Sequence, residues 1–307
     1  MADVAPALVY RGHEDNVFAL AWSPDGEMLA SAGRDRVVHV WQAASGADIY
    51  VYRAHSGPVL SLAWSPDGRL LASGDTAGET HVWRVPTGEQ VTIYRGHKRF
   101  VRSLAWSPDG ELLASGGDFG DGTVQLWRVA TGEHLATHGD LKRVLAVAWS
   151  PDGQRLAACS FDGRVQTWEA RTRARLFTYT GHACPLYALS WSQIGLIASA
   201  GEDGQIHIWQ DLTGQRLYTS NFHTHAVKAL AWLPDGSALA SGGEDLLLRV
   251  WQPASDRVLL DYRGHPRWIR ALCWSPDGSS LASASAHAVH VLKKITTKIS
   301  STPAIEL

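Results

Sequence analysis

A tryptophan that precedes a tight turn recurs at a nearly constant interval, and this period constrains the fold more than any other feature of the chain. Successive copies are separated by 42, 42, 43, 42, 41 and 42 residues. The seven copies are Trp22, Trp64, Trp106, Trp149, Trp191, Trp232 and Trp274. A fixed period of this size predicts a repeat protein, in which each unit buries its apolar faces by stacking on its neighbours.

Each repeat carries the signals of a hairpin. Six of the seven tryptophans are followed by Ser or Leu and then by Pro-Asp-Gly, as in residues 23–26, whereas the fifth repeat departs from this pattern at residues 192–195. Proline presets φ, aspartate bonds its own backbone and glycine supplies a positive φ, so the motif predicts a tight turn. Alternating stretches on both sides, such as residues 17–22 and 28–31, predict two paired strands.

A third and a fourth strand complete the unit. The third ends at a second tryptophan series, replaced by Leu292 in the seventh repeat: Trp41, Trp83, Trp127, Trp168, Trp209 and Trp251. The fourth, such as residues 48–52, leads into the next repeat. No segment shows a sustained helical period, so the sequence predicts an all-β fold, a seven-bladed β-propeller of four-stranded antiparallel blades.

The start of the chain supplies a strand that the last repeat lacks. Residues 7–11 match the fourth strands at residues 90–95 and 258–263, while the seventh repeat ends after its third strand. We therefore expect the N-terminal strand to complete the last blade and close the ring, which leaves no exposed blade edge. The propeller is predicted to span residues 1–293. Residues 294–307 are predicted to form a C-terminal tail outside the repeat; the alternative is that this tail competes for the same edge.

Gly-His pairs, whose histidine lies nine residues before the turn tryptophan, make the repeats resemble those of the WD-repeat (WD40-type) β-propeller family. The pairs are Gly12-His13, Gly96-His97, Gly181-His182 and Gly264-His265, with Ala54-His55 in the second repeat. The resemblance implies a buried His, Ser, Asp and Trp network in each blade, here called the tetrad, which is stable in a core only when every member is hydrogen-bonded. By position, complete tetrads are expected in blades one, three, five and six: His13, Ser31, Asp35 and Trp41; His97, Ser115, Asp121 and Trp127; His182, Ser199, Asp203 and Trp209; His223, Ser241, Asp245 and Trp251.

The remaining blades depart from the tetrad pattern. Blade four has Asp140 and Ala158 at the His and Ser positions, and blades two and seven have Ala77 and Ala286 at the Asp position. The tetrads of these blades are therefore predicted to be incomplete.

Other histidines are assigned by the same register. In blade six the nine-residue offset selects His223 and not His225. We expect His138, His225 and the histidines of the third strands to lie nearer the solvent; the latter are His39, His81, His207 and His290.

Composition excludes several classes of protein. A formal charge of −2 argues against a specialist in nucleic-acid binding, and no apolar run is long enough for a membrane span. The first residues lack the basic and apolar regions of a signal peptide. The three cysteines Cys159, Cys184 and Cys273 have unrelated spacings, which predict reduced thiols in a cytoplasmic protein and neither a disulfide framework nor a zinc site.

Signatures of catalysis are absent from the sequence. There is no Walker A loop, no Gly-x-Ser-x-Gly motif, no His-Glu-x-x-His motif and no dinucleotide fingerprint. Ser, His and Asp recur in nearly every repeat, whereas a catalytic site would interrupt the repeat once. His223 and His225 could form a metal pair but have no acidic or Cys partner nearby in sequence. We predict no catalytic residue, no cofactor and no metal site.

Binding is the function that the resemblance implies, because WD-repeat propellers are typically platforms for proteins or peptides. This family usually binds them on the narrower face of the ring, around the central channel. Residues that differ between blades at the starts of the first strands and beside the turn aspartates are the candidate ligand-binding residues: Arg34, Phe100, Arg102, Arg143, Phe161, Tyr187, Lys228, Trp268 and Arg270. Aromatic and basic residues are enriched at binding hot spots. The alternative is that the arginines are only solvated and the aromatic rings pack between blades.

We therefore predict a monomeric, non-catalytic scaffold that binds a protein or peptide with an acidic or mixed surface. The alternative is a structural or sensor array that forms the C-terminal part of a larger signalling protein. Trp268 belongs to neither tryptophan series, so it discriminates between these hypotheses. An indole exposed at the channel mouth favours binding, and an indole buried between blades favours a structural role.

Overall fold

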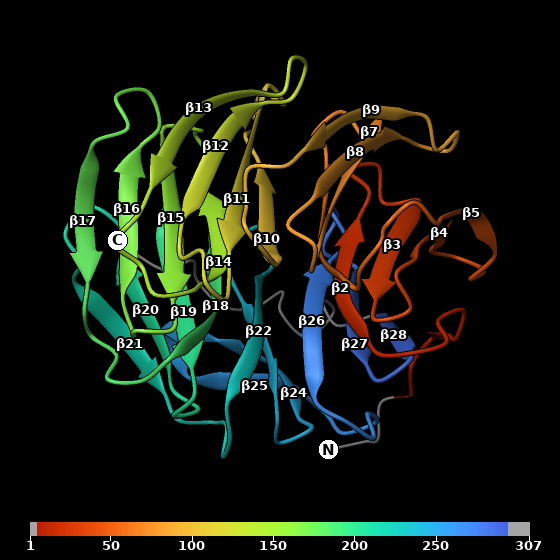
Figure 1. Cartoon of the computed structure of the whole chain (residues 1–307). Coiled ribbons are helices and arrows are strands. Elements are labelled where there is room, and N and C mark those ends of the chain that lie inside the picture. Colours follow the sequence, from red (N-terminus) through yellow and green to blue (C-terminus); the bar gives the residue numbers. More distant parts are fainter. Residues whose placement is uncertain (1–4, 294–307) are drawn as a thin grey trace.

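The computed structural model describes residues 5–293, which form seven four-stranded antiparallel sheets arranged as a ring (Figure 1). Within this range the only helix is a single 3₁₀ turn, Pro253–Ser255. The predicted all-β, seven-bladed propeller is therefore confirmed. In Figure 1 the blue strands of blade seven lie directly beside red β2, which shows how the two ends of the chain meet.

Each blade runs from the channel outward in chain order. The innermost strands are β2 (Val17–Trp22), β6 (Val59–Trp64), β10 (Val101–Trp106), β14 (Val144–Trp149), β18 (Leu186–Trp191), β22 (Val227–Trp232) and β26 (Ile269–Trp274). The second strands are β3 (Met28–Gly33), β7 (Leu70–Asp75), β11 (Leu112–Gly117), β15 (Arg155–Ser160), β19 (Leu196–Gly201), β23 (Leu239–Gly243) and β27 (Ser280–Ser285).

The outer half of each blade follows the same order. The third strands are β4 (Val38–Gln42), β8 (Thr80–Arg84), β12 (Val124–Arg128), β16 (Val165–Glu169), β20 (Ile206–Gln210), β24 (Leu248–Gln252) and β28 (Ala288–Lys293). The outermost strands of blades one to six are β5 (Asp48–Tyr52), β9 (Gln90–Tyr94), β13 (Glu133–His138), β17 (Arg175–Tyr179), β21 (Arg216–Ser220) and β25 (Arg257–Tyr262).

The outermost strand of blade seven comes from the start of the chain. β1 (Leu8–Tyr10) pairs antiparallel with β28, with Leu8 opposite Val291 and Tyr10 opposite Val289. This confirms that the N-terminal strand closes the ring, and it fills the edge that the last repeat leaves open. The predicted tail at residues 294–307 lies outside the described residues.

The first tryptophan series joins neighbouring blades. The indole Nε1 of Trp64 donates a hydrogen bond to the carbonyl oxygen of Ala21 in the preceding blade, at 3.2 Å, and Trp22 does the same to Cys273 across the closure of the ring. Equivalent bonds are made by four further tryptophans: Trp106, Trp149, Trp232 and Trp274. The exception is Trp191, whose buried Nε1 has no partner among residues 5–293. The 42-residue period therefore reflects an inter-blade contact.

Candidate functional site

Complete tetrads occur in blades one and two within the described residues. His13 Nδ1 donates to Asp35 at 2.8 Å, its Nε2 lies 2.8 Å from Ser31 Oγ, and Trp41 Nε1 donates to the same hydroxyl at 3.2 Å. Because the carboxylate accepts the Nδ1 proton, Nε2 accepts from the serine hydroxyl. Burial alone would raise the pKa of Asp35, but the hydrogen bond and charge of His13, together with two backbone amide hydrogen bonds, outweigh it and lower that pKa.

Blade two corrects the prediction that its tetrad is incomplete. Asp75 lies 2.9 Å from His55 Nδ1, while Ser73 bonds His55 Nε2 at 2.7 Å and accepts from Trp83. The carboxylate comes from the last residue of β7, two positions before Ala77. Blade two has this aspartate at the strand end where blade one has Gly33, and this difference could have predicted the complete tetrad. The position of the turn aspartate in the repeat could not.

Blades three and six lack the tryptophan bond that was expected. His97 bonds Asp121 at 3.2 Å and Ser115 at 2.8 Å. His223, and not the exposed His225, bonds Asp245 at 2.9 Å and Ser241 at 2.8 Å. The buried Nε1 atoms of Trp127 and Trp251 have no hydrogen-bond partner in the described chain, so each of these networks has three members.

Blade five also departs from the expected complete tetrad. His182 Nε2 lies 2.9 Å from Ser199 Oγ, but its buried Nδ1 has no partner among residues 5–293. Asp203 is exposed and accepts a hydrogen bond from the backbone of Gln205. The Asp203 carboxylate therefore does not contact the histidine ring, whereas the turn aspartates of blades one, three and six do.

Blades four and seven are incomplete for the reason that the sequence indicates. In blade four, Arg164 bonds Asp162 at 2.6 Å and pairs with Asp140 at 3.5 Å in place of the histidine. In blade seven, His265 bonds Ser283 at 2.7 Å, while its Nδ1 has no partner in the described part of the chain.

The third-strand histidines are buried, which contradicts the prediction that they lie nearer the solvent. They are His39, His81, His207 and His290. Each bonds a tyrosine hydroxyl from the outermost strand of the preceding blade, at 2.5 to 3.0 Å: Tyr10, Tyr52, Tyr179 and Tyr262. Burial and a neighbouring cation lower the pKa of His207 to about 4, so it stays neutral. The sequence feature that could have predicted this burial is the tyrosine that recurs at the end of the fourth strand.

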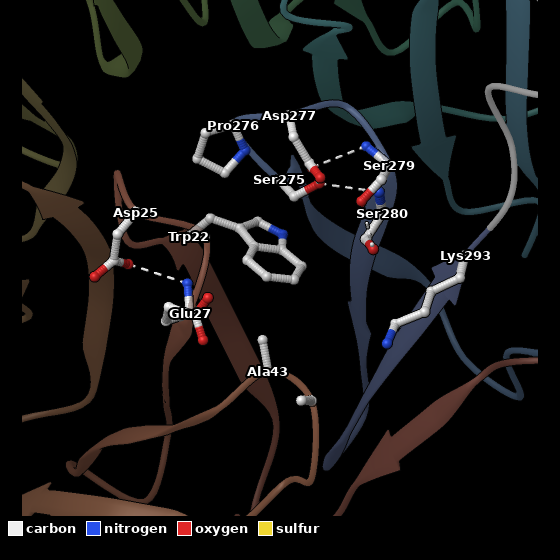
Figure 2. Close-up of a pocket in the computed structure, with 12 residues that line it drawn as sticks. Trp22, Asp25, Glu27, Ala43, Ser275, Pro276, Asp277, Ser279, Ser280 and Lys293 are labelled. Carbon is white, nitrogen blue, oxygen red and sulfur yellow. Dashed lines mark hydrogen bonds between the residues drawn. The ribbon is translucent and has the colours of Figure 1, made fainter.

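The turn face of the ring carries a groove between blades seven and one, with a volume of 560 Å³. Figure 2 shows the indole of Trp22 projecting between the Ser275–Ser280 turn and Ala43, with Lys293 extending toward it. A groove between blades three and four has equivalent lining residues, among them Pro108, Asp109 and Trp149. Because the groove recurs with the repeat, it reflects the packing of blades and does not mark a dedicated site.

The opposite face surrounds the mouth of the channel and is here called the channel face. The second residue of every innermost strand lines a cavity there: Phe18, Leu60, Arg102, Leu145, Tyr187, Lys228 and Arg270. In each blade the pairing register shifts at this residue. A β-bulge re-aims a side chain, and here it directs one side chain per blade into the channel.

Three of these seven residues are cations with unequal partners. Lys228 Nζ lies 3.0 Å from Glu244 Oε1 and 3.2 Å from the centroid of the Tyr187 ring. Arg102 and Arg270 form no ion pair with any residue in the range 5–293. Burial lowers the pKa of both guanidinium groups, and the charges of Asp118 on Arg102 and of Glu244 on Arg270 offset this only in part. The charge of Arg270 also lowers the pKa of Arg102. The channel mouth therefore holds two positive charges that no carboxylate of the described residues contacts directly.

The other candidate residues lie around this mouth. Arg143 bonds both oxygens of Asp118 and stacks over Phe161, with 4.6 Å between its guanidinium carbon and the ring centroid. Arg34 and the half-buried Phe100 line an apolar cavity of 300 Å³. The structure thus places all of the candidate residues on one face, but three of them, Arg34, Arg143 and Lys228, already have acidic partners.

Trp268 is exposed at the channel mouth, with 44% of its surface accessible. It lines a cavity of 410 Å³ together with Asn16, Arg267, Arg270 and residues 286–287. The guanidinium carbon of Arg270 lies 5.5 Å from the Trp268 ring centroid. Asp118 also belongs to this face but was not selected from the sequence, because its contact with Arg143 joins blades three and four.

Comparison with known proteins gives one family along most of the chain. The family model described as "WD domain, G-beta repeat" matches seven times, at residues 5–42, 46–84, 88–128, 132–169, 173–210, 214–252 and 257–291. Among residues 5–293 there is no helix with the length and hydropathy of a membrane span.

Individual curated relatives match over about one repeat. Coronin-7 from Homo sapiens is 46% identical over 44 residues, which are 14% of this chain and 5% of that protein. Cell division cycle 20.1, cofactor of APC complex, from Arabidopsis thaliana is 56% identical over 32 residues, 10% of this chain and 7% of that protein. A probable cytosolic iron-sulfur protein assembly protein, CIAO1 homolog, from Nematostella vectensis is 53% identical over 30 residues, 10% of this chain and 9% of that protein.

Proposed function

This chain belongs to the WD40 repeat family, and from that premise we propose that it is a non-catalytic scaffold that binds a protein or peptide through its channel face. The family generally serves as a non-catalytic platform, and none of the relatives named above is described as an enzyme. The chain spans less than a tenth of the length of those relatives, so their partners are not transferred to it.

The pair Arg102 and Arg270, which has no direct ion pair within the described residues, is the observation that carries the proposal. Two guanidinium groups at a partly desolvated mouth repel each other, and an acidic ligand would relieve this repulsion through charge-assisted hydrogen bonds. A carboxylate of the partner is the ligand proposed for this position. Lys228 and Arg143 contribute less because Glu244 and Asp118 already neutralise them.

An aromatic anchor beside this charge sets the second requirement on the partner. Trp268 supplies a large exposed ring next to Arg270, and exposed aromatic residues of this kind are enriched at binding hot spots. Phe100 and Arg34 border the apolar cavity on the blade-three side of the mouth. We propose that the partner presents an acidic residue to the channel and apolar residues to these two cavities. We further propose that the protein is a cytoplasmic monomer.

The experiment is selection from a displayed peptide library against the wild-type protein. We expect enrichment of peptides that combine Asp or Glu with apolar residues, and we expect binding of the selected peptides to weaken at least tenfold in Arg102→Ala and Arg270→Ala. The matched control is Arg84→Ala, because Arg84 is exposed and pairs with Glu89 at the opposite end of a blade. Selected peptides without acidic residues, or peptides that bind Arg270→Ala as well as wild type, would contradict the proposal.

A further inference from the structure

Blade five brings together three metal-ligating side chains at the rim of the channel face. His182, Cys184 and Asp203 each offer one ligand atom, and these atoms lie within 4.8 Å of one another. His182 Nε2 is bonded to Ser199, which leaves Nδ1 as the ring atom that faces the site. No other described tetrad histidine has a cysteine two residues after it; the corresponding residues are Asp15, Gly57, Arg99, His225 and Arg267.

The unpartnered Nδ1 of His182 is the observation that points to a ligand. The residue is only 7% exposed, and a buried ring nitrogen without a hydrogen bond is costly. In blades one, two, three and six the equivalent Nδ1 is satisfied by an aspartate at 2.8 to 3.2 Å. In blade five Asp203 uses one oxygen for the backbone of Gln205 and does not satisfy the ring.

Two other groups of three ligating residues show why blade five is different. The groups are His13, Asp35 and His39, and His55, Asp75 and His81. In both, the first histidine bonds the aspartate through Nδ1 and a serine through Nε2, and the Nδ1 of the second bonds a tyrosine hydroxyl, so these nitrogens already have partners. In blade seven the Nδ1 of His265 also lacks a partner, but Ala286 and Arg267 stand where ligands would be needed.

We propose that His182 Nδ1, Cys184 Sγ and a carboxylate oxygen of Asp203 bind a divalent zinc ion. Imidazole, thiolate and carboxylate are the ligands that Zn²⁺ takes in proteins, and a thiolate disfavours Mg²⁺ and Ca²⁺. Typical Zn–N and Zn–S bonds would place the first two ligand atoms roughly 3.6 Å apart. The ligand atoms already lie within 4.8 Å of one another, and Cys184 is half-buried and Asp203 exposed, so neither side chain is enclosed by the core. Solvent occupies the fourth position, since the site opens at the surface.

The surroundings support the histidine as a ligand through Nδ1. Metal binding there requires the ring proton on Nε2, where Ser199 Oγ at 2.9 Å accepts it. Ser199 is itself anchored by a hydrogen bond from Trp209 Nε1 at 3.1 Å. The backbone of the 182–184 loop packs closely on Gly163 of blade four, where an added Cβ would lie 2.8 Å from the Cys184 carbonyl oxygen. The loop that carries His182 and Cys184 is therefore held against blade four.

Titration of the reduced, metal-free full chain with Co²⁺ tests the site, because a cobalt–thiolate bond has a characteristic charge-transfer absorption. We expect one Co²⁺ per chain with this absorption, and its displacement by Zn²⁺. The variant Cys184→Ala should lose the absorption, and Asp203→Asn should bind Co²⁺ at least about tenfold more weakly. The control is Cys273→Ala, which places at that position the residue that most other repeats have and should bind Co²⁺ as wild type does.

Two outcomes would overturn the proposal: no thiolate charge transfer in the wild-type chain, or an unchanged absorption in Cys184→Ala. Far-UV circular dichroism of each variant establishes that the propeller is folded before titration. The inference does not depend on the peptide-binding role, because the readout involves neither Arg270 nor Trp268.

Discussion

The phenol ring of Tyr10 lies parallel to the indole of Trp41, with 4.4 Å between ring centroids and 6° between ring planes, although the two residues belong to different blades. The Tyr10 hydroxyl donates to Asp48 at 2.5 Å and bonds His39 Nδ1 at 2.8 Å. The same stacking recurs between Tyr52 of blade one and Trp83 of blade two. The first strand therefore closes the ring twice, by pairing with β28 and by packing on blade one.

Removing the Tyr10 ring should destabilise the whole propeller. We expect Tyr10→Ala to lower the free energy of unfolding by about 3–5 kcal/mol, as for other buried aromatic rings, and Tyr10→Phe by about 0.5–1.5 kcal/mol through the lost hydroxyl bonds. Urea unfolding measures both. Leu176→Ala, at a half-exposed position of an outermost strand, is the control. A Tyr10→Ala loss no larger than that of Leu176→Ala would show that ring closure does not depend on this contact.

The turn aspartates of blades three and five should differ in their contribution to stability. Asp121→Ala leaves His97 Nδ1 and the Lys98 amide without their acceptor, so we expect a loss of about 1–3 kcal/mol. Asp203→Ala removes a similar turn bond but no bond to a histidine, and should cost clearly less. Thermal and urea unfolding in the presence of a chelator make the comparison. Equal losses would mean that the Asp121–His97 bond adds nothing.

Stability should decrease as the pH falls below 6.5, in part because of His265. Burial, followed by the charge of the stacked His290, lowers the pKa of His265 to about 3 from its ordinary value of 6.5. Between these values the unfolded chain binds a proton that the folded chain excludes, so this histidine lowers the free energy of unfolding by up to about 1.4 kcal/mol per pH unit.

The variant His265→Gln tests this pH dependence. The other groups that face the His265 ring are Ser283 and Tyr262. Burial lowers the pKa of the neighbouring His290, and the charge of Arg11 lowers it further. We expect a shallower dependence of the unfolding free energy on pH between 6.5 and 4 in this variant than in wild type. The exposed His225→Gln should leave the dependence unchanged, and an unchanged slope in His265→Gln would refute the assignment.

Trp268 should contribute to binding and not to folding. Its ring is 44% exposed, so Trp268→Ala should change the free energy of unfolding by no more than about 0.5 kcal/mol. Binding of a selected acidic peptide should weaken by about 2 kcal/mol, the loss typical of a hot-spot residue. Calorimetry measures the affinity, and Leu212→Ala, at an exposed residue after β20, is the control. A strongly destabilised Trp268→Ala would place the ring in the structural framework.

We propose that residues 294–307 lie outside the propeller, and their removal tests this. The outer edge of β28 is already paired with β1, so the shortened chain should melt at the same temperature as the full chain. A decrease of several degrees would indicate that the tail contributes to the last blade.

The number of blades and the closure of the ring followed from the sequence because their causes are local and repeated. Pro-Asp-Gly turns specify hairpins, and a tryptophan placed once per unit bonds the preceding blade, as Trp64 bonds Ala21. The match of residues 7–11 to the other fourth strands was enough to predict the pairing of β1 with β28.

The tetrads were predictable only as far as the chain register governs them. The carboxylate of Asp75 reaches His55 from a strand end, although the expected turn position holds Ala77. His39 is buried because Tyr10 covers it from the adjacent blade. Contacts of this kind join residues that no spacing within one repeat relates, so the sequence pattern could not reveal them.

The sequence alone determined the repeat, the propeller and the residue types available to each blade, since these depend on turn chemistry and strand periodicity. Tertiary structure decided which of those residues act together. A bulge in each innermost strand and the closure of the ring place Arg102 and Arg270 in one channel without a direct ion pair among the described residues, while Asp118 pairs with Arg143. Charge balance at the channel mouth is a sum over all seven blades, and only the closed ring brings those charges within range of one another.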